Sequence, residues 1–193
     1  MSEKVRRTFH SLLSLVLNNF LRRLPHSPSR ILECLGLKAS DTVIDFGCGK
    51  GFFTIPFAKK ARRVIAIDIR AAALEKAEKY VAKSKVEVEF FQNNGKNIPL
   101  PNSIADLIFL RHVYHELDDR QAVLKELARL LKPNGRLAIM EKTEKKLTPI
   151  GPPVVPVSEI ETAIQNVGLK VSEKIRVGNE TIVIGKRDAH NEE

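Results

Sequence analysis

A glycine-rich loop is the first feature of this sequence that could do chemistry. Residues Gly47–Gly51 read Gly-Cys-Gly-Lys-Gly and follow Asp45 at the end of a short apolar run. Glycines at this spacing permit a tight turn and let a ligand approach backbone N–H groups closely at the start of a helix. A structural strand-to-helix turn favours glycine too, so the triplet by itself is a weak signal.

An acidic residue follows the loop at the spacing typical of ribose recognition. Asp68 lies 21 residues beyond Gly47, near the end of the second apolar run. From that position a carboxylate can accept hydrogen bonds from both hydroxyls of a ribose. The loop and Asp68 together predict a cofactor that contains ribose.

The position of the third glycine distinguishes between cofactor classes. A dinucleotide fingerprint, G-x-G-x-x-G, needs glycine at position 52, where this sequence has Phe52. A P-loop ends in Gly-Lys-Ser/Thr, whereas here Lys50 is followed by Gly51. A pyrophosphate ligand is therefore disfavoured. The rival hypothesis of a nicotinamide oxidoreductase is weakened further because the chain is too short for a second full domain.

Alternating strands and helices must position these residues. Apolar runs predict strands over 42–46, 64–69, 86–90, 106–110 and 136–140. Helical composition separates them over 52–61, 71–82 and 118–131, and a helix over 158–167 precedes a β-hairpin of 169–177 and 180–185. This alternation predicts an α/β fold: a mostly parallel sheet with helices on both faces and one antiparallel edge strand.

The predicted organisation is one domain with two short flanking segments. A chain of 193 residues suits a single domain. Residues 1–27 place apolar side chains at helical spacing among arginines, which predicts an amphipathic helix that could form a lid. The domain is predicted to span 28–186, with a first helix over 30–35 capped by Ser29, and 187–193 to form a flexible tail.

Composition limits the class of protein and its partners. No apolar run approaches the roughly 20 residues that cross a bilayer, and no signal-peptide cleavage pattern follows the N-terminal apolar stretch, so a cytoplasmic protein is expected. The two cysteines, Cys34 and Cys48, indicate neither a disulfide framework nor a metal site. The net charge of +9 favours polyanions such as RNA, or acidic substrates, but also fits a lysine-rich solvated surface.

Five segments of the sequence form a more specific pattern together than any of them alone. They are 43–51, 64–68, 94–100, 105–110 with His115, and 130–137. Through them, residues 28–186 resemble the class I S-adenosylmethionine-dependent methyltransferases, in the group of type 11 methyltransferase domains and ubiquinone/menaquinone C-methylase-like proteins. The resemblance implies a seven-stranded Rossmann-like sheet, S-adenosylmethionine as methyl donor, S-adenosylhomocysteine as product, and SN2 transfer to a nucleophile of the acceptor.

The resemblance also implies which residues bind the cofactor. They are Asp45, Gly47, Cys48, Gly49, Gly51, Asp68, Ile69, Asn94, Gly95 and Arg111. The family usually has an Asp that contacts the adenine amino group where this chain has Asn94. An amide oxygen can still accept a hydrogen bond from that amino group. The backbone of Arg111 is implied to border the methionine part of the cofactor.

The residues after the fourth predicted strand are candidates for acting on the methyl acceptor. His112 and Tyr114 are predicted as catalytic residues, serving as base or orienting group for an acceptor hydroxyl or amine. His115 and Glu141 lie at the same predicted rim. The alternatives are a packing or capping role for His115 and a core position for Tyr114. No catalytic dyad is required, because the sulfonium supplies the driving force.

Two questions about function stay open at this stage. His112-x-x-His115 is not the metalloprotease spacing, which needs two histidines four residues apart, so no metal is predicted. A small molecule is the predicted acceptor, and the oligomeric state is undetermined. The alternative from another functional class is a non-catalytic cofactor-binding or RNA-associated protein of the same fold.

Overall fold

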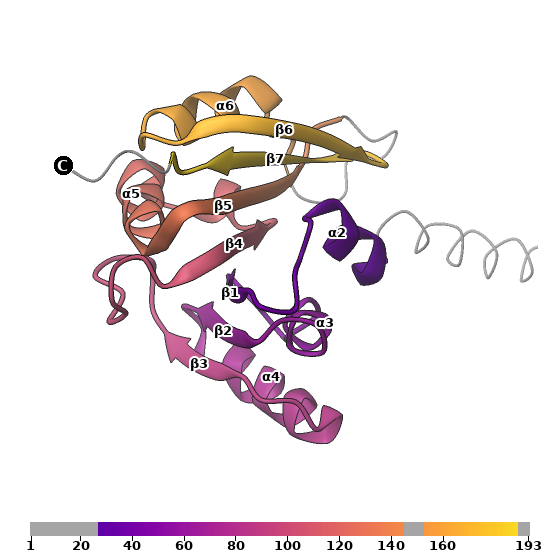
Figure 1. Ribbon diagram of the computed structural model, residues 1–193. Coiled ribbons are helices and arrows are strands. Elements are labelled where there is room, and N and C mark those ends of the chain that lie inside the picture. The colour runs from indigo at the N-terminus through magenta and orange to yellow at the C-terminus, as the bar shows by residue number, and fades with distance from the viewer. Residues whose placement is uncertain (1–26, 145–152, 189–193) are drawn as a thin grey trace, which may run out of the picture.

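A seven-stranded sheet forms the centre of this computed structural model, which describes residues 27–144 and 153–188 (Figure 1). The strands are β1 (Thr42–Phe46), β2 (Arg63–Asp68), β3 (Glu89–Gln92), β4 (Ala105–Arg111), β5 (Leu131–Lys142), β6 (Lys170–Val177) and β7 (Glu180–Lys186). Their order is β3-β2-β1-β4-β5-β7-β6. β7 runs antiparallel to both β5 and β6, and the other neighbouring pairs are parallel. The predicted fold class is confirmed, with the reversed strand second from the edge.

Helices cover both faces of the sheet (Figure 1). They are α2 (Pro28–Cys34), α3 (Thr54–Ala58), α4 (Ala71–Ser84), α5 (Arg120–Leu130) and α6 (Val157–Gln165), with a 3-10 turn η1 (Tyr114–Glu116). Alternate strand residues point to opposite faces. On one face Val43 and Phe109 pack with α2 and α3, while on the other Ile44 and Ile108 pack with α5 and α6.

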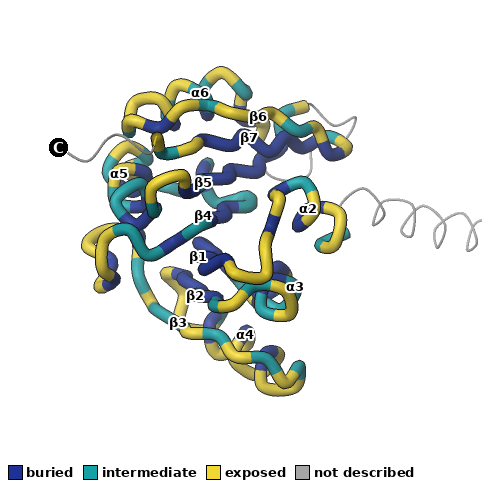
Figure 2. The backbone as a smooth tube through the Cα atoms, viewed as in Figure 1, coloured by how far each residue is buried: buried dark blue, intermediate teal, exposed yellow. Residues whose placement is uncertain are grey.

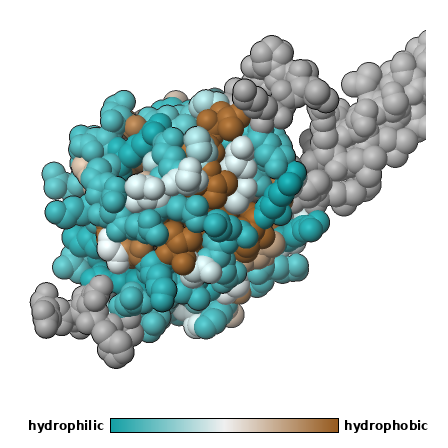
Figure 3. Space-filling model, turned by 90° about the horizontal axis from the view of Figure 1, so that it is seen from above, coloured by the Kyte–Doolittle hydropathy of each residue, from teal (hydrophilic) through white to brown (hydrophobic). Residues whose placement is uncertain are grey.

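The central strands are buried and the outer strand is polar. All five residues of β1 are buried, as expected for a parallel strand covered on both faces (Figure 2). The edge strand β6 instead carries exposed charged side chains such as Glu173 and Lys174. Seen from the side of α6 and β6, the surface is mostly hydrophilic, with separate hydrophobic patches (Figure 3). Charges on an edge strand discourage pairing with another chain.

Several predicted boundaries are wrong by a few residues. The side chain of Ser27, not Ser29, accepts a hydrogen bond from Arg30 N at 3.4 Å and caps α2, with Pro28 at the first helical position. The third strand is Glu89–Gln92 rather than 86–90, and α3 covers only part of 52–61. β5 begins at Leu131 because the chain pairs with β4 before and after the Pro133–Gly135 turn.

The predicted flanking segments lie largely outside the described residues. Of the proposed helical lid over 1–27, only Ser27 is described. Of the tail over 187–193, Arg187 and Asp188 are described, and Arg187 Nη1 donates to the carbonyl oxygens of Ala128 and Leu131 at 3.3 and 2.9 Å. Arg187 is therefore anchored to the end of α5.

The strand register brings the functional candidates to one edge of the sheet. Phe46, the last residue of β1, is level with Ile67 of β2 and Leu110 of β4. Arg111 at the end of β4 is level with Met140 of β5. β7 begins at this edge, because its first residue, Glu180, pairs with Lys142 of β5. We refer to this as the carboxyl edge.

Candidate active site

A cleft of about 280 Å³ lies at the carboxyl edge, and we call it the carboxyl-edge cleft. Its walls come from the segments that follow β1, β2, β3 and β4, which is where ligands bind in open α/β sheets. The lining includes six of the predicted site residues: Gly47, Asp68, Ile69, Asn94, Arg111 and His112. The topology thus brings together residues that are far apart in the sequence.

The glycine loop lies close to the segment after β4. Gly47 has φ +73°, and a Cβ added there would lie 2.2 Å from Val113 Cγ2. Gly49 has φ +56°, but the nearest atom to an added Cβ is Arg70 Nη2 at 3.9 Å. Glycine at position 47 therefore serves a close approach of two segments as well as a left-handed backbone conformation.

Asp68 connects the glycine loop with the segment after β2. Its Oδ2 accepts a hydrogen bond from Gly49 N at 2.8 Å, and its Oδ1 accepts one from Arg70 N at 2.9 Å. The guanidinium of Arg70 also lies on this carboxylate, with Nε 3.2 Å from Oδ1. Burial opposes ionisation of Asp68, but the hydrogen bonds from Arg70 and Gly49 outweigh it and lower the pKa. Asp68 is a carboxylate at neutral pH.

Asp45 does not line the cleft but lies buried beneath the glycine loop, where it bonds to the start of α3. Its Oδ2 accepts a hydrogen bond from Thr54 Oγ1 at 2.5 Å, which joins the end of β1 to the start of α3. Burial raises the pKa of Asp45 to about 7; the bond from Thr54 partly offsets this, and the nearby Asp68 adds to it. The Cys48 thiol is buried as well, and burial raises its pKa, so it stays protonated.

The segment after β3 turns sharply at the cleft. Asn93 Oδ1 accepts a hydrogen bond from Gly95 N at 2.7 Å, and Asn94 Oδ1 accepts one from Lys96 N at 3.1 Å. Gly95 has φ +86°, and a Cβ there would lie 2.7 Å from Val123 Cγ1. Gly95 therefore packs against α5, while Asn94 lines the cleft.

A polar cluster lies at the end of β4, and the sequence predicted Arg111 and His112 in it but not Glu180. His112 has φ +55°, a conformation rare for a residue with a side chain, and its N–H donates to Met140 O at 3.0 Å. Glu180 Oε1 lies 3.0 Å from His112 Nε2 and 3.1 Å from Arg111 Nη2, and Oε2 lies 3.3 Å from Arg111 Nε. Burial opposes ionisation of Glu180, but His112 and Arg111 outweigh it and lower the pKa to about 2.

The sequence did not predict Glu180 as a site residue, because its place beside His112 depends on the register between β5 and β7. The Gly178-Asn179 turn predicts that Glu180 begins a strand. Nothing in the local pattern shows that this strand lies beside β5, where its first residue faces the end of β4.

The other candidates after β4 lie behind the cleft. The fully buried Glu141 accepts from His115, with Oε2 2.9 Å from His115 Nδ1. Tyr114 is buried in the core, and Arg120 stacks over its ring with Cζ 4.7 Å from the centroid. Burial raises the pKa of Tyr114 and the nearby Glu159 adds to this. The structure does not bring Tyr114, His115 or Glu141 into the carboxyl-edge cleft.

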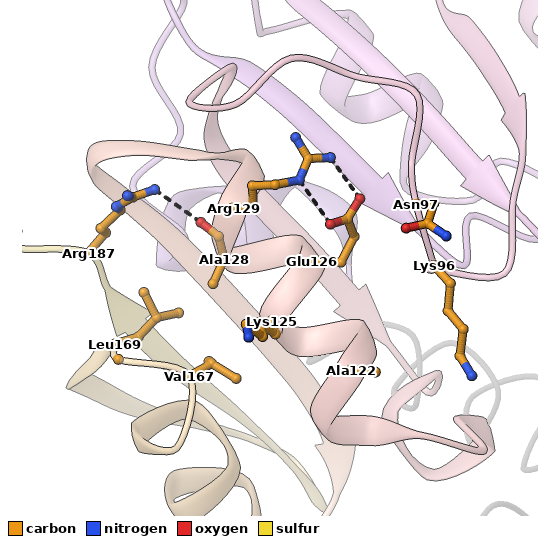
Figure 4. Close-up of a pocket in the computed structure, with 11 residues that line it drawn as sticks. Lys96, Asn97, Ala122, Lys125, Glu126, Ala128, Arg129, Val167, Leu169 and Arg187 are labelled. Atoms are coloured by element: carbon orange, nitrogen blue, oxygen red, sulfur yellow. Dashed lines mark hydrogen bonds and ion pairs between the residues drawn. The ribbon is translucent and has the colours of Figure 1, made fainter. Parts of the chain in front are cut away.

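A larger hollow of about 680 Å³ lies along the outer side of α5 and beside the turn before β6 (Figure 4). Both arginines that line it have partners: Arg129 bonds to both oxygens of Glu126, and Arg187 bonds to Ala128 O. None of the predicted site residues lines it.

The described residues offer neither a metal-ligand cluster nor a membrane-spanning helix. Within 27–144 and 153–188, no three His, Cys, Asp or Glu side chains are grouped so that they could hold a metal ion. Among the helices in these same ranges, none is long and apolar enough to cross a membrane.

Comparison with known proteins identifies the same fold and family from several directions. A family model described as a methyltransferase domain matches residues 44–139. A crystal structure of an S-adenosylmethionine-dependent methyltransferase from Aquifex aeolicus is 32% identical, covers 85% of this chain and 92% of that one, and superimposes with a TM-score of 0.78. The YcgJ protein of Bacillus subtilis has 17% identity and a TM-score of 0.73 over 84% of this chain and 98% of its own, which shows likeness of fold.

Curated relatives match over a shorter stretch. The ubiquinone/menaquinone biosynthesis C-methyltransferase UbiE of Enterobacter sp. (strain 638) is 27% identical over 124 residues, 62% of this chain. The Escherichia coli proteins of the same name show the same identity and coverage. The matched stretch spans 49% of these relatives, so the chain spans about half their length.

Proposed function

The chain belongs to the class I S-adenosylmethionine-dependent methyltransferases of the type 11 group, and we propose that it moves a methyl group by SN2 transfer to a small-molecule acceptor. When bound, S-adenosylmethionine supplies a methyl group activated by the adjoining sulfonium. The chain's own residues then have to bind the nucleoside, exclude water and align the acceptor.

The carboxyl-edge cleft fits the cofactor, and this is the observation that carries the proposal. Asp68 presents a carboxylate that can accept from ribose hydroxyls. The next residue, Ile69, is 61% exposed and lines the cleft, where its apolar side chain suits contact with a flat base. Asn94 also lines the cleft, and an amide oxygen, which has two lone pairs, can accept from an adenine amino group besides Lys96 N.

The acceptor side of the proposal rests on the end of β4. Arg111 and His112 line the cleft, and His112 has the chemistry to remove a proton from an acceptor near neutral pH. Similarity to C-methyltransferases of ubiquinone and menaquinone biosynthesis favours a small organic acceptor, although the chain spans only half of those relatives.

Calorimetry is the first test of the cofactor. Purified protein is titrated with S-adenosylmethionine, S-adenosylhomocysteine and, for comparison, NADH. We expect saturable binding of the first two and none of NADH. Folded protein that binds neither S-adenosylmethionine nor S-adenosylhomocysteine would overturn the proposal and leave a non-catalytic member of the fold.

Transfer is then tested with S-adenosylmethionine carrying a labelled methyl group. The acceptors are a panel of phenols and hydroquinones, with total RNA and casein in parallel reactions. Label in a small organic product supports the proposal. Label in the RNA or casein instead would replace the proposed small molecule with a macromolecular acceptor.

A further inference from the structure

We propose that Glu180 is a positioning residue that fixes the proton of neutral His112 on Nε2, so that Nδ1 is the nitrogen that removes a proton from the methyl acceptor. This inference rests on the proposed function, because it assigns a role within the same reaction. Glu180 contributes through His112 and does not itself line the cleft.

The contact between the two side chains is short and buried. Glu180 Oε1 lies 3.0 Å from His112 Nε2, and the Glu180 side chain is 8% exposed. Nε2 itself is buried and its contact with Glu180 is within ion-pair distance but is not an aligned hydrogen bond, whereas the His112 side chain as a whole is 29% exposed and lines the cleft. The ring therefore turns one nitrogen toward the protein and leaves another part of its edge toward the cleft.

The chemistry of the pair decides which nitrogen carries the proton. An ionised carboxylate can only accept hydrogen bonds, so the imidazole nitrogen facing it must be the N–H. In neutral imidazole the other nitrogen then has the free electron pair. A carboxylate that orients a histidine in this way also stabilises the imidazolium that forms during catalysis.

Arg111 keeps Glu180 in the state that this role requires. Its Nε and Nη2 lie 3.3 and 3.1 Å from the two carboxylate oxygens, a bidentate arrangement that fixes the plane of the carboxylate. The low pKa of Glu180 means that the group is ionised throughout the neutral range. Arg111 also offsets much of the buried negative charge.

The backbone holds His112 in place for this geometry. Its φ of +55° is costly for a histidine, and such strain persists where surrounding structure imposes it. Two contacts hold the backbone of His112 in this conformation. They are the hydrogen bond from His112 N to Met140 O and the pairing of Arg111 with β5. Glu180 is the first residue of β7, which pairs with β5 on the side opposite β4.

The proposed step balances in atoms and charge. Nδ1 takes the proton from the reacting atom of the acceptor while the electron pair left on that atom forms the bond to the methyl carbon. The carbon–sulfur bond breaks and its electrons return to sulfur, which gives neutral S-adenosylhomocysteine. The imidazolium then releases its proton to water. The acceptor class is therefore a molecule whose nucleophile arrives protonated, such as a phenolic or enolic hydroxyl, rather than a thioether or tertiary amine.

Other charged groups also lie around His112. Arg111 precedes it and Glu180 faces it from β7, with Lys142 paired opposite Glu180. The rest of the cleft contributes Asp68 and Arg70 after β2, Lys96 after β3, and Glu116, Asp118 and Asp119 after β4. Among these groups, Glu180 lies within ion-pair distance of His112, and Arg111 in turn lies within ion-pair distance of Glu180.

The test is nuclear magnetic resonance of the full chain with S-adenosylhomocysteine bound. Long-range 1H–15N spectra of 15N-labelled protein distinguish the two neutral imidazole tautomers, and loss of one set of signals in His112→Gln assigns His112. We expect the Nε2–H tautomer. The Nδ1–H tautomer in the unmodified protein would overturn the inference without need of any Glu180 variant.

The same signals test the role of Glu180. In Glu180→Gln the preference for the Nε2–H tautomer should weaken, because an amide can present either a donor or an acceptor to Nε2, whereas a carboxylate can only accept. Glu144→Gln is the matched control: Glu144 also pairs with an arginine near the β6–β7 turn but is exposed, so the tautomer preference of His112 should stay. An unchanged tautomer preference in Glu180→Gln would contradict the inference.

The two proposals fail in different ways. Absence of S-adenosylhomocysteine binding would contradict the proposed function. Binding with the Nδ1–H tautomer of His112, or with a tautomer preference insensitive to Glu180, would contradict this inference alone.

Discussion

The carboxylate of Asp68 accepts a hydrogen bond from Gly49 N at 2.8 Å, so the residue that ends β2 also holds the glycine loop that follows β1. The same carboxylate lines the carboxyl-edge cleft. One side chain therefore has two tasks, since it fixes the loop and presents lone pairs to a ribose. Because the two tasks share one group, removing the whole carboxylate would perturb both.

Asp68→Asn keeps the bond from Gly49, because the amide oxygen can still accept it, while the charge and the oxygen that accepts from Arg70 are lost. We expect the Kd for S-adenosylhomocysteine to rise by roughly 10–100-fold, the value of a hydrogen bond to a charged group. Titration calorimetry measures this Kd. Asp106→Asn, at the opposite end of β4, should leave the Kd unchanged. An unaltered Kd in Asp68→Asn would show that the ribose lies elsewhere.

Arg70 occupies lone pairs of the carboxylate that the ribose is proposed to use. Its Nε lies 3.2 Å from Asp68 Oδ1 and its side chain is 65% exposed. An exposed ion pair contributes little, so Arg70→Met should tighten S-adenosylhomocysteine binding only about 2–5-fold at low salt. The difference should shrink at high ionic strength, where the pair in the unmodified protein is screened. Weaker binding in Arg70→Met would make the guanidinium part of the cofactor site.

Gly47 and Gly49 offer a matched pair for testing the loop. Both have positive φ, but an added Cβ meets Val113 at 2.2 Å only at Gly47. Gly49→Ala should cost about 1–2 kcal/mol of unfolding free energy from the backbone alone, and Gly47→Ala distinctly more. Urea denaturation gives both values. Adding Val113→Ala should recover part of the loss in Gly47→Ala, and no recovery would mean that the side-chain clash is not its cause.

Much of the fold could be predicted because the signals are local. β1 and β2 are runs of apolar residues ending in Asp45-Phe46-Gly47 and Asp68, and burial on both faces requires such composition. Where the predicted start of α2 was wrong, a single contact decided the true boundary. Serine is a favourable N-cap residue, so both Ser27 and Ser29 were candidates. Pro28 occupies the first helical position, which makes Ser27 the N-cap.

The site could be predicted only where it follows directly from the chain order. The glycine loop and Asp68 meet because consecutive parallel strands end at one edge. Glu180 could not be found, because its contact with His112 spans 68 residues and depends on β7 lying between β5 and β6. Tyr114 is two residues beyond His112, yet the 3-10 turn directs its ring into the core. A pattern that places residues at the same rim does not show which of them point into the cleft.

Asp45 predicts an unusual dependence of stability on pH. Burial raises its pKa to about 7 in the folded chain, from an ordinary value of 3.8 in the unfolded chain. Between these values the folded state keeps a proton that the unfolded state has released, so stability falls as the pH rises from about 4 to about 7 and then levels off. Asp45→Asn removes this titration while its oxygen can still accept from Thr54.

Asp45→Asn should therefore stabilise the chain at pH 8 by roughly 2–4 kcal/mol relative to unmodified protein, with little difference at pH 4. Urea denaturation without ligand across this range measures the effect. Asp106→Asn is the control of opposite sign: burial opposes its ionisation, but bonds from Lys132 and Thr42 lower its pKa, so its ionised form stabilises the fold above pH 4. That variant should lose stability at pH 8. Stability curves for Asp45→Asn and unmodified protein that run parallel from pH 4 to 8 would show that Asp45 ionises in the folded chain as freely as in water.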